Sequence, residues 1–296
     1  MNSQGIAATM QEMEELRKKI NSRYIWMVIM MVGILVFAII GRMTPGIGAL
    51  FPIIIVVCVL GLFLLMKGGN LQKRLKMLYK ETFVRQMLQE HFQDVYYNWE
   101  QGMDQMLIKS SGICKLGNRY YSEDYINAVY RGIRFQQADV TIQYHTSSGR
   151  SSHTTTYFRG RMFCFEYPTK RSSAVQIFSS NFLYAGQPAS GVQNRKLQLE
   201  SVGFNKQFKV KAMSEHDAFY ILTPQMMERI QALKNKYGGI TMVFDSGYLM
   251  VGLNTNMDSF DANLRKPIVY PEEKRRMEQD VAVIEELIQI LNCIPQ

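Results

Sequence analysis

Two long apolar runs near the amino terminus constrain this chain more than any other feature. They cover residues 24–40 and 46–66, and neither contains a charged side chain. At about 1.5 Å per helical residue they reach roughly 25 and 31 Å, against a hydrocarbon core of about 30 Å. A signal peptide has a shorter leader, and a buried helix of a soluble protein keeps one polar face. The runs therefore predict a two-helix transmembrane hairpin over residues 24–66.

Basic side chains on either side of the hairpin predict its orientation. Residues 1–23 carry four Lys and Arg side chains and residues 67–85 carry six, whereas the linker at 41–46 has only Arg42. Lysine and arginine accumulate on the cytoplasmic side of membrane proteins. We therefore expect a multi-pass protein whose termini and main domain are both cytoplasmic, with residues 1–23 as a short cytoplasmic segment.

Much of the net charge of +9 lies beside the second apolar run, where six basic side chains face one acidic side chain. Cations next to anionic lipid contribute about 1 kcal/mol each, so the lipid bilayer explains this placement and no nucleic-acid partner is expected. The predicted lipid contacts are Lys67, Lys73, Arg74, Lys76 and Lys80.

Residues 67–99 have the spacing of a basic amphipathic helix, with apolar side chains recurring at three, four or seven positions. This juxtamembrane helix is expected to join the bilayer to the main domain. Met13, Leu16 and Ile20 form a matching stripe that is expected to pack against it.

The pattern changes in residues 100–296, which predict an α+β domain with an antiparallel sheet and flanking helices. Residues 139–144 alternate between polar and apolar side chains as a half-buried strand requires, and the run 157–167 follows a polar loop. Together they predict a β-hairpin, and residues 240–245 and 248–254 predict another. Further short strands are expected at 174–178, 196–201 and 206–211.

Two helix starts and a long final helix complete this domain. Ser214 and Asp217 match a capping box, and Thr223 followed by Pro224 is a second helix cap. From Pro271 onward apolar side chains recur at helical spacing, which predicts a helix that covers one face of the sheet.

The order of these elements resembles the bacterial DUF3137 family. The resemblance includes the apolar hairpin, residues 121–140, residues 158–167 and the stretch 199–230 with the β-hairpin after it. The positions that carry it in the stretch 199–230 are Leu199, Glu200, Phe204, Phe208, Val210, Asp217, Ala218, Tyr220, Leu222, Thr223 and Pro224. It implies a protein of the bacterial inner membrane, but no activity, catalytic residue or cofactor.

The residues themselves give no chemical motif of high specificity, because no P-loop, dinucleotide-binding, zinc-protease or nucleophile-elbow pattern occurs. Ser214, His216 and Asp217 lie too close in sequence for a triad and suit a helix cap. His145 and His153 have no third ligand nearby in sequence, which is a weak metal signal. We therefore predict no catalytic, cofactor-binding or metal-binding residue.

The polar loop at 146–156 is the remaining candidate, because its hydroxyl and guanidinium donors suit a phosphate group or a protein partner. The residues expected to contribute are Ser148, Arg150, Ser151 and His153.

A bare anchor and a domain without clustered titratable groups favour a membrane-anchored binding or adaptor protein with a protein partner. Two alternatives stay open. One is an enzyme whose active-site residues meet only in the folded chain, and the other is a module that senses phospholipid headgroups.

Overall fold

The computed structural model describes residues 3–43, 51–149, 151–166, 174–187, 192, 196–245, 247–256 and 259–292; side chains at 3–7, 37–38, 40–43, 51–55, 58–59 and 62–68 are not described. The chain forms two compact units. The first comprises Met1–Met87 and Asp261–Met277, and the second comprises Leu88–Phe260 and Glu278–Gln296. The chain thus leaves the first unit after Met87 and returns to it between Asp261 and Met277.

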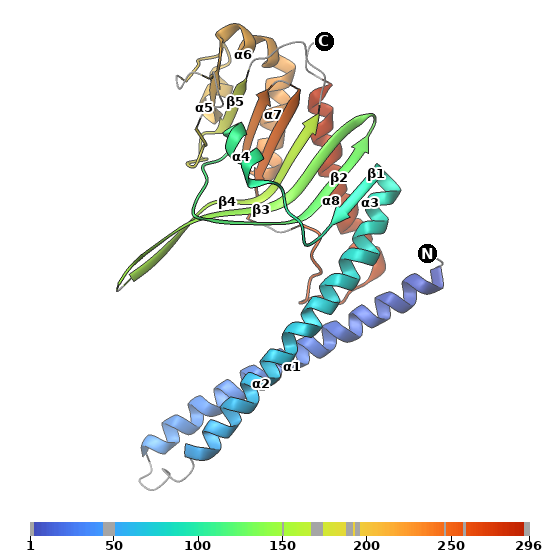
Figure 1. Cartoon of the computed structure of the whole chain (residues 1–296), viewed down its shortest axis with the longest axis vertical. Helices are drawn as coiled ribbons and strands as arrows, with labels where there is room; N and C mark the ends of the chain where they lie inside the picture. The colour runs from blue at the N-terminus through green and yellow to red at the C-terminus, as the bar shows by residue number, and fades with distance from the viewer. Residues whose placement is uncertain are drawn as a thin grey trace. The chain divides into compact units, whose positions relative to one another are not determined.

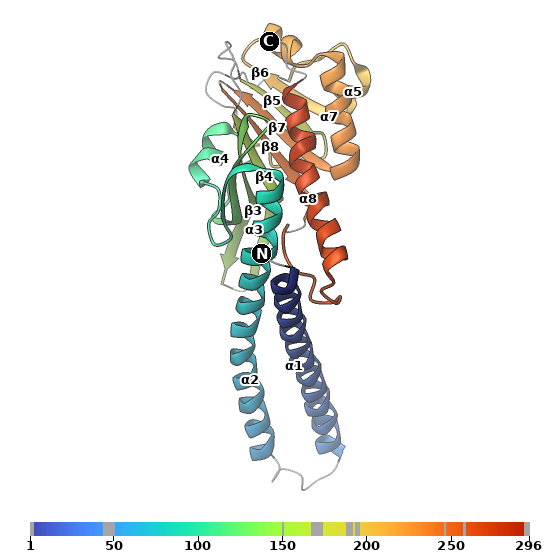
Figure 2. The same cartoon turned by 90° about the vertical axis from the view of Figure 1, so that its right-hand side faces the viewer.

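Helices make up most of the first unit. They are α1 (Ser3–Met43), α2 (Phe51–Leu78) and a π-helical segment (Tyr79–Val84) that leads into α3 (Arg85–His91). Helices α1 and α2 contact each other and run side by side (Figures 1 and 2). Apolar residues of these two helices and of the π-helical segment are buried, among them Met13, Leu16, Ile20, Leu75 and Tyr79.

Residues 261–277 attach to α1 through hydrogen bonds. The Arg17 guanidinium and the Asn21 side-chain amide donate to the Leu264 carbonyl at 3.3 and 2.9 Å, and the Glu14 carboxylate accepts from the Ile268 backbone N–H at 3.0 Å. Polar side chains on one face of α1 thus hold a segment that lies about 250 residues away in sequence.

The predicted amphipathic helix ends earlier than its spacing indicates. It stops at His91, and Gln93–Asn98 forms strand β1, which pairs with β2. The prediction of a helix to residue 99 is therefore wrong over its last turns. The competing signal is long-range: β1 gains its hydrogen bonds from a strand that the local spacing does not reveal.

An eight-stranded antiparallel sheet forms the centre of the second unit, with the order β1-β2-β3-β4-β8-β7-β5-β6. Its further strands are β2 (Arg119–Tyr130), β3 (Ile133–Ser148), β4 (Ser151–Glu166), β5 (Val175–Ser179), β6 (Phe208–Ala212), β7 (Gly239–Asp245) and β8 (Tyr248–Asn254). The α+β class with an antiparallel sheet and flanking helices is confirmed. The two predicted hairpins are β3–β4 and β7–β8.

One strand prediction fails. Residues 196–201 make only an isolated bridge, from Leu197 to Val210, before α5 (Val202–Gln207) begins. The Ser201 side chain accepts a hydrogen bond from the Phe204 N–H and caps this helix. A local cap therefore overrides the apolar alternation of these residues.

Helices cover both faces of the sheet in the second unit. Helix α4 (Gln105–Ser111) lies on one face, and α7 (Pro224–Tyr237) lies on the other beside residues 278–291 of α8 (Tyr270–Leu291) (Figure 2). Both predicted caps are confirmed: Ser214 starts α6 (Glu215–Ile221), Thr223 starts α7, and α7 ends at Gly238, whose φ is +82°.

Beneath α4, apolar side chains of the long strands form the core, among them Val140, Phe158, Met162 and Met250. Gly160 allows β4 and β8 to approach closely, because a Cβ atom there would lie 2.1 Å from the Leu253 carbonyl oxygen.

Candidate functional site

A β-bulge shapes one end of the sheet. The register of β2 against β3 shifts between Glu123 and Ile126, and Asp124 takes a φ of +59°. The buried Asp124 carboxylate accepts a hydrogen bond from the Tyr97 hydroxyl at 2.8 Å, and its backbone N–H donates to the Trp99 carbonyl. Bulges redirect the side chains next to them. Here the bulge brings the segment after β1 close to the middle of β2.

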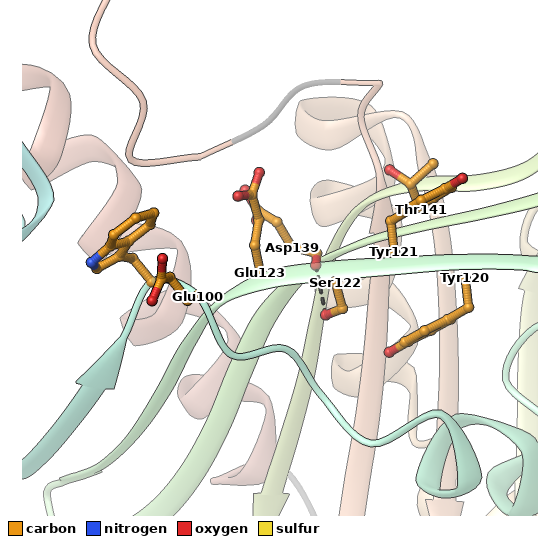
Figure 3. A pocket seen from close by; sticks show the side chains of 8 residues that line it. Glu100, Tyr120, Tyr121, Ser122, Glu123, Asp139 and Thr141 are labelled. Atoms are coloured by element: carbon orange, nitrogen blue, oxygen red, sulfur yellow. Dashed lines mark hydrogen bonds between the residues drawn. The ribbon is translucent and has the colours of Figure 1, made fainter. Parts of the chain in front are cut away.

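A cleft of about 560 Å³ lies beside this bulge. Its lining residues come from β2, β3 and the segment after β1: Trp99, Glu100, Tyr120, Tyr121, Ser122, Glu123, Asp139 and Thr141. Tyr121, Glu123, Asp139 and Thr141 point to the same side of the strands, as their alternation requires (Figure 3). Small-molecule sites occupy about 300–1,000 Å³, so the cleft is large enough for one.

Ser122 ties the wall of the cleft to the strand behind it. Its hydroxyl donates to the Asp139 carbonyl at 2.8 Å and accepts from the Met103 backbone N–H at 3.0 Å. The segment that carries Trp99 and Glu100 is thereby anchored at its far end.

Asp139 is the least exposed ionisable group in the lining, with 4% of its surface accessible. One carboxylate oxygen, Oδ2, accepts from the Ser259 backbone N–H at 2.5 Å. The other, Oδ1, is buried and has no hydrogen-bond partner among the described residues. Burial raises the pKa of Asp139 to about 7, against the opposing effect of the nearby Arg161 guanidinium.

The row of residues across the sheet explains this electrostatic environment. Glu123 of β2 lies directly opposite Asp139, and Arg161 of β4 lies on its other side. The guanidinium of Arg161 has other partners: it contacts the Asp280 carboxylate at 3.3 Å and donates to the Gln137 side-chain oxygen at 2.9 Å. Arg161 also stacks on Phe163 and Phe260. The carboxylate in contact with Arg161 is therefore that of Asp280, although the guanidinium charge still lowers the pKa of Asp139.

The polar loop predicted from the sequence is the β3–β4 turn and lies apart from the cleft lining. The Ser148 and Ser151 hydroxyls are 3.3 Å apart, and His153 is paired in register with Thr146. Ser148, Ser151 and His153 are exposed, and Arg150 lies outside the described residues. A phosphate or partner role for this loop stays a prediction.

The basic residues predicted to contact lipid differ in exposure. Lys73 and Arg74 are exposed, with Arg74 contacting Glu12 at 2.5 Å, and Lys76 is half-buried. Lys80 is fully buried and pairs with Asp261 at 2.9 Å, which removes it from the set of lipid contacts. The side chain of Lys67 is outside the described residues.

The weak catalytic and metal patterns have structural explanations. The Ser214 hydroxyl accepts from the Asp217 backbone N–H at 3.1 Å and donates to its carboxylate, as a helix cap does. His145 hydrogen-bonds to Thr154 at 2.9 Å. Among the described residues, no group of three His, Cys, Asp or Glu side chains is placed to hold a metal ion.

Sequence reasoning missed the residues of the cleft. Alternation placed Asp139 on the polar face of a half-buried strand, but the structure buries that face too. Asp280 of α8 contacts Arg161, the neighbour of Asp139, so the sheet is covered on this side. The only local signal was the run of tyrosines and acids at 120–125.

Residues 156–293 match the family described as "Protein of unknown function (DUF3137)", which confirms the resemblance over residues 158–167 and over 199–230 with the β-hairpin after it. No protein of curated function is detectably similar to the chain. One solved structure with a significant match is the "crystal structure of the mycobacterial trehalose monomycolate transport factor A, TtfA". It is 9% identical, with 72% of this chain and 94% of that chain covered and a TM-score of 0.37.

Proposed function

We propose that this chain is a membrane-anchored binding protein, in which a transmembrane hairpin of residues 24–40 and 46–66 holds the sheet domain at the inner face of a bacterial cytoplasmic membrane. The domain acts by binding a protein or ligand and not by catalysis. One observation carries the anchor: the apolar side chains of α1 point outward. Ten large apolar residues between Tyr24 and Ile39 are each 50–62% exposed.

The exposed residues lie at consecutive positions such as Ile25 and Trp26 or Ile29, Met31 and Val32. At about 100° per residue they surround more of α1 than one neighbouring helix covers. Soluble proteins seldom expose apolar patches above a few hundred Å². Residues 8–36 of α1 are also long and apolar enough to cross a membrane. Lipid is the solvent that fits this surface.

Support for a second span comes from α2. Its residues 51–66 continue the second apolar run, and the described side chains of Val56 and Leu60 are 66% and 55% exposed. The basic residues Lys67, Lys73, Arg74 and Lys76 then lie just beyond the span, where anionic lipid favours them.

Fractionation tests the anchor. The chain is expected to stay with membranes through alkaline carbonate and high salt, and to need detergent for release. Replacing Ile29 and Val32 together with lysine is expected to weaken insertion, because each lysine costs about 2.5–3.5 kcal/mol at the centre of a span. Gln11→Lys, at an exposed polar position of the same helix, is the control. A wild-type chain that is soluble without detergent would refute the anchor.

Reporter fusions test the orientation. Alkaline phosphatase is expected to be active when inserted in the linker at 41–46 and inactive when fused at the carboxyl end. The reverse pattern would overturn the cytoplasmic placement. Crosslinking in membranes is then expected to enrich one or a few partner proteins, and the absence of any partner would count against the adaptor role.

A further inference from the structure

The cleft between β2, β3 and the segment after β1 contains an arrangement that the binding function does not yet explain. We propose that it binds an organic cation with N–H donors, a primary ammonium or guanidinium group, which hydrogen-bonds to Asp139 and lies against Trp99 and Tyr121. This inference specifies a ligand for the proposed binding function. It rests on one part of that proposal, namely that the domain acts by binding.

The first argument is the unpartnered oxygen of Asp139. A buried acceptor without a hydrogen bond costs about 1–3 kcal/mol, and more when it is charged. The described protein groups supply only the Ser259 N–H, which is bonded to the other oxygen. Asp139 lines the cleft, so a ligand donor entering there can supply the missing bond. A quaternary ammonium has no N–H and cannot.

The second argument is the sign of the charge around the cleft. Glu123 lies directly opposite Asp139, and like charges at such positions destabilise a sheet. Glu100 adds a third carboxylate to the lining. The basic neighbour, Arg161, contacts Asp280 and Gln137 and still lowers the pKa of Asp139, so one guanidinium faces the carboxylates of Asp139, Asp280 and Glu123. The cleft therefore favours a cation over a neutral or anionic ligand.

The third argument is the aromatic part of the lining. Trp99 is half-buried and Tyr121 is 58% exposed, so each can present a ring to a ligand. A cation over an aromatic ring gains about 0.5–2 kcal/mol. The three carboxylates of the lining do not form a group that could hold a metal ion among the described residues, so an organic cation fits the site better.

Agmatine is a suitable probe, because it carries an ammonium and a guanidinium group. Its binding to the full chain in a non-ionic detergent can be followed by Trp99 fluorescence after Trp26→Phe removes the only other tryptophan. We expect saturable binding that Asp139→Asn weakens at least tenfold and Trp99→Ala weakens several-fold. Glu166→Gln, an exposed carboxylate outside the cleft, is the matched control and is expected to leave affinity unchanged.

Two further arms sharpen the result. Choline, a cation without an N–H donor, is expected to bind at least tenfold more weakly than agmatine. A short peptide with a single arginine distinguishes the sources of the cation: peptide binding without agmatine binding indicates a side chain of a protein partner, and the reverse indicates a free amine.

The pH dependence gives an independent readout. The groups that face Asp139 are Glu123 and Asp124 from β2, Arg161 from β4 with its partner Asp280 from α8, and the Ser259 N–H. A cation needs the ionised carboxylate, so agmatine affinity is expected to rise about tenfold from pH 6 to pH 8, as Asp139 loses a proton near pH 7. Asp139→Asn is expected to abolish this rise.

Absence of binding by both agmatine and the peptide would overturn the proposal, as would binding that Asp139→Asn and choline leave unaffected. Membrane extraction of the Asp139→Asn chain is expected to match wild type. A failed binding test therefore leaves the anchor intact, and a failed extraction test leaves the cleft intact.

Discussion

Two buried charged groups of the first unit, Lys80 and Glu273, differ from the buried Asp139 of the second unit in how their charges are paired. In the first unit, the buried Lys80 ammonium contacts the Asp261 carboxylate, and the buried Glu273 carboxylate accepts from Tyr79 and pairs with Arg276 at 3.1 Å. In the second unit, Asp139 has one donor and one unpartnered oxygen among the residues that the structure describes. A buried charge is tolerated when its partners replace water. Lys80 and Glu273 meet this condition through partners within the first unit, whereas Asp139 leaves one oxygen for a ligand or a proton.

The largest expected effect comes from breaking the pair in the first unit. Asp261→Asn removes the carboxylate that the fully buried Lys80 contacts. Breaking a buried pair costs about 3–5 kcal/mol, and we expect a loss at the low end of that range because the Asp261 side chain is 41% exposed. Thermal unfolding of the full chain in detergent measures the loss. Lys80→Met, which replaces the buried cation with an apolar side chain, is the control and is expected to cost much less. If both variants lost the same free energy of unfolding, the ion pair would contribute no more to stability than an apolar side chain does by packing.

Removing the charge in the second unit is expected to have the opposite sign. The folded-state pKa of Asp139 is raised from 3.8 to about 7, so the folded chain binds its proton more tightly than the unfolded chain. This group therefore lowers stability as pH rises from about 4 to 7, by on the order of 3 kcal/mol.

Asp139→Asn keeps the shape and the acceptor for the Ser259 N–H but cannot ionise. It is expected to be more stable than wild type at pH 8 and nearly equal to it at pH 4.5. Denaturant titration at both pH values measures the difference. A variant that is less stable at pH 8 would show that the ionised carboxylate is satisfied in the folded chain.

The smallest effect is expected at an exposed pair of the first unit. Arg74 contacts Glu12 at 2.5 Å, but the two side chains are 61% and 41% exposed. Exposed pairs contribute about 0–1 kcal/mol and are screened by salt. Arg74→Ala is therefore expected to shift the unfolding temperature little, and less at 0.5 M salt than at low salt. A loss as large as that of Asp261→Asn would contradict the dependence on burial.

Local patterns predicted many of the elements. The caps at Ser214 and Thr223, the two hairpins and the final helix follow from residue types within a few positions of each other. Failures occur where a distant segment competes: Gln93–Asn98 pairs with β2, and Ser201 caps a helix where alternation favoured a strand. The cleft could not be predicted from the sequence for the same reason. Its lining residues come from the segment after β1, from β2 and from β3, and they lie up to about forty residues apart in the chain.

The sequence by itself determined that two charge-free apolar runs stand near the amino terminus and that an α+β domain follows, because length, charge and period are properties of neighbouring residues. Only the tertiary structure decided which polar residues are buried. Asp139 and Lys80 both occupy positions that read as solvent-facing, and both are enclosed by segments distant in sequence, Ser259 for one and Asp261 for the other. Burial depends on what covers a face, and a periodic pattern does not specify its cover.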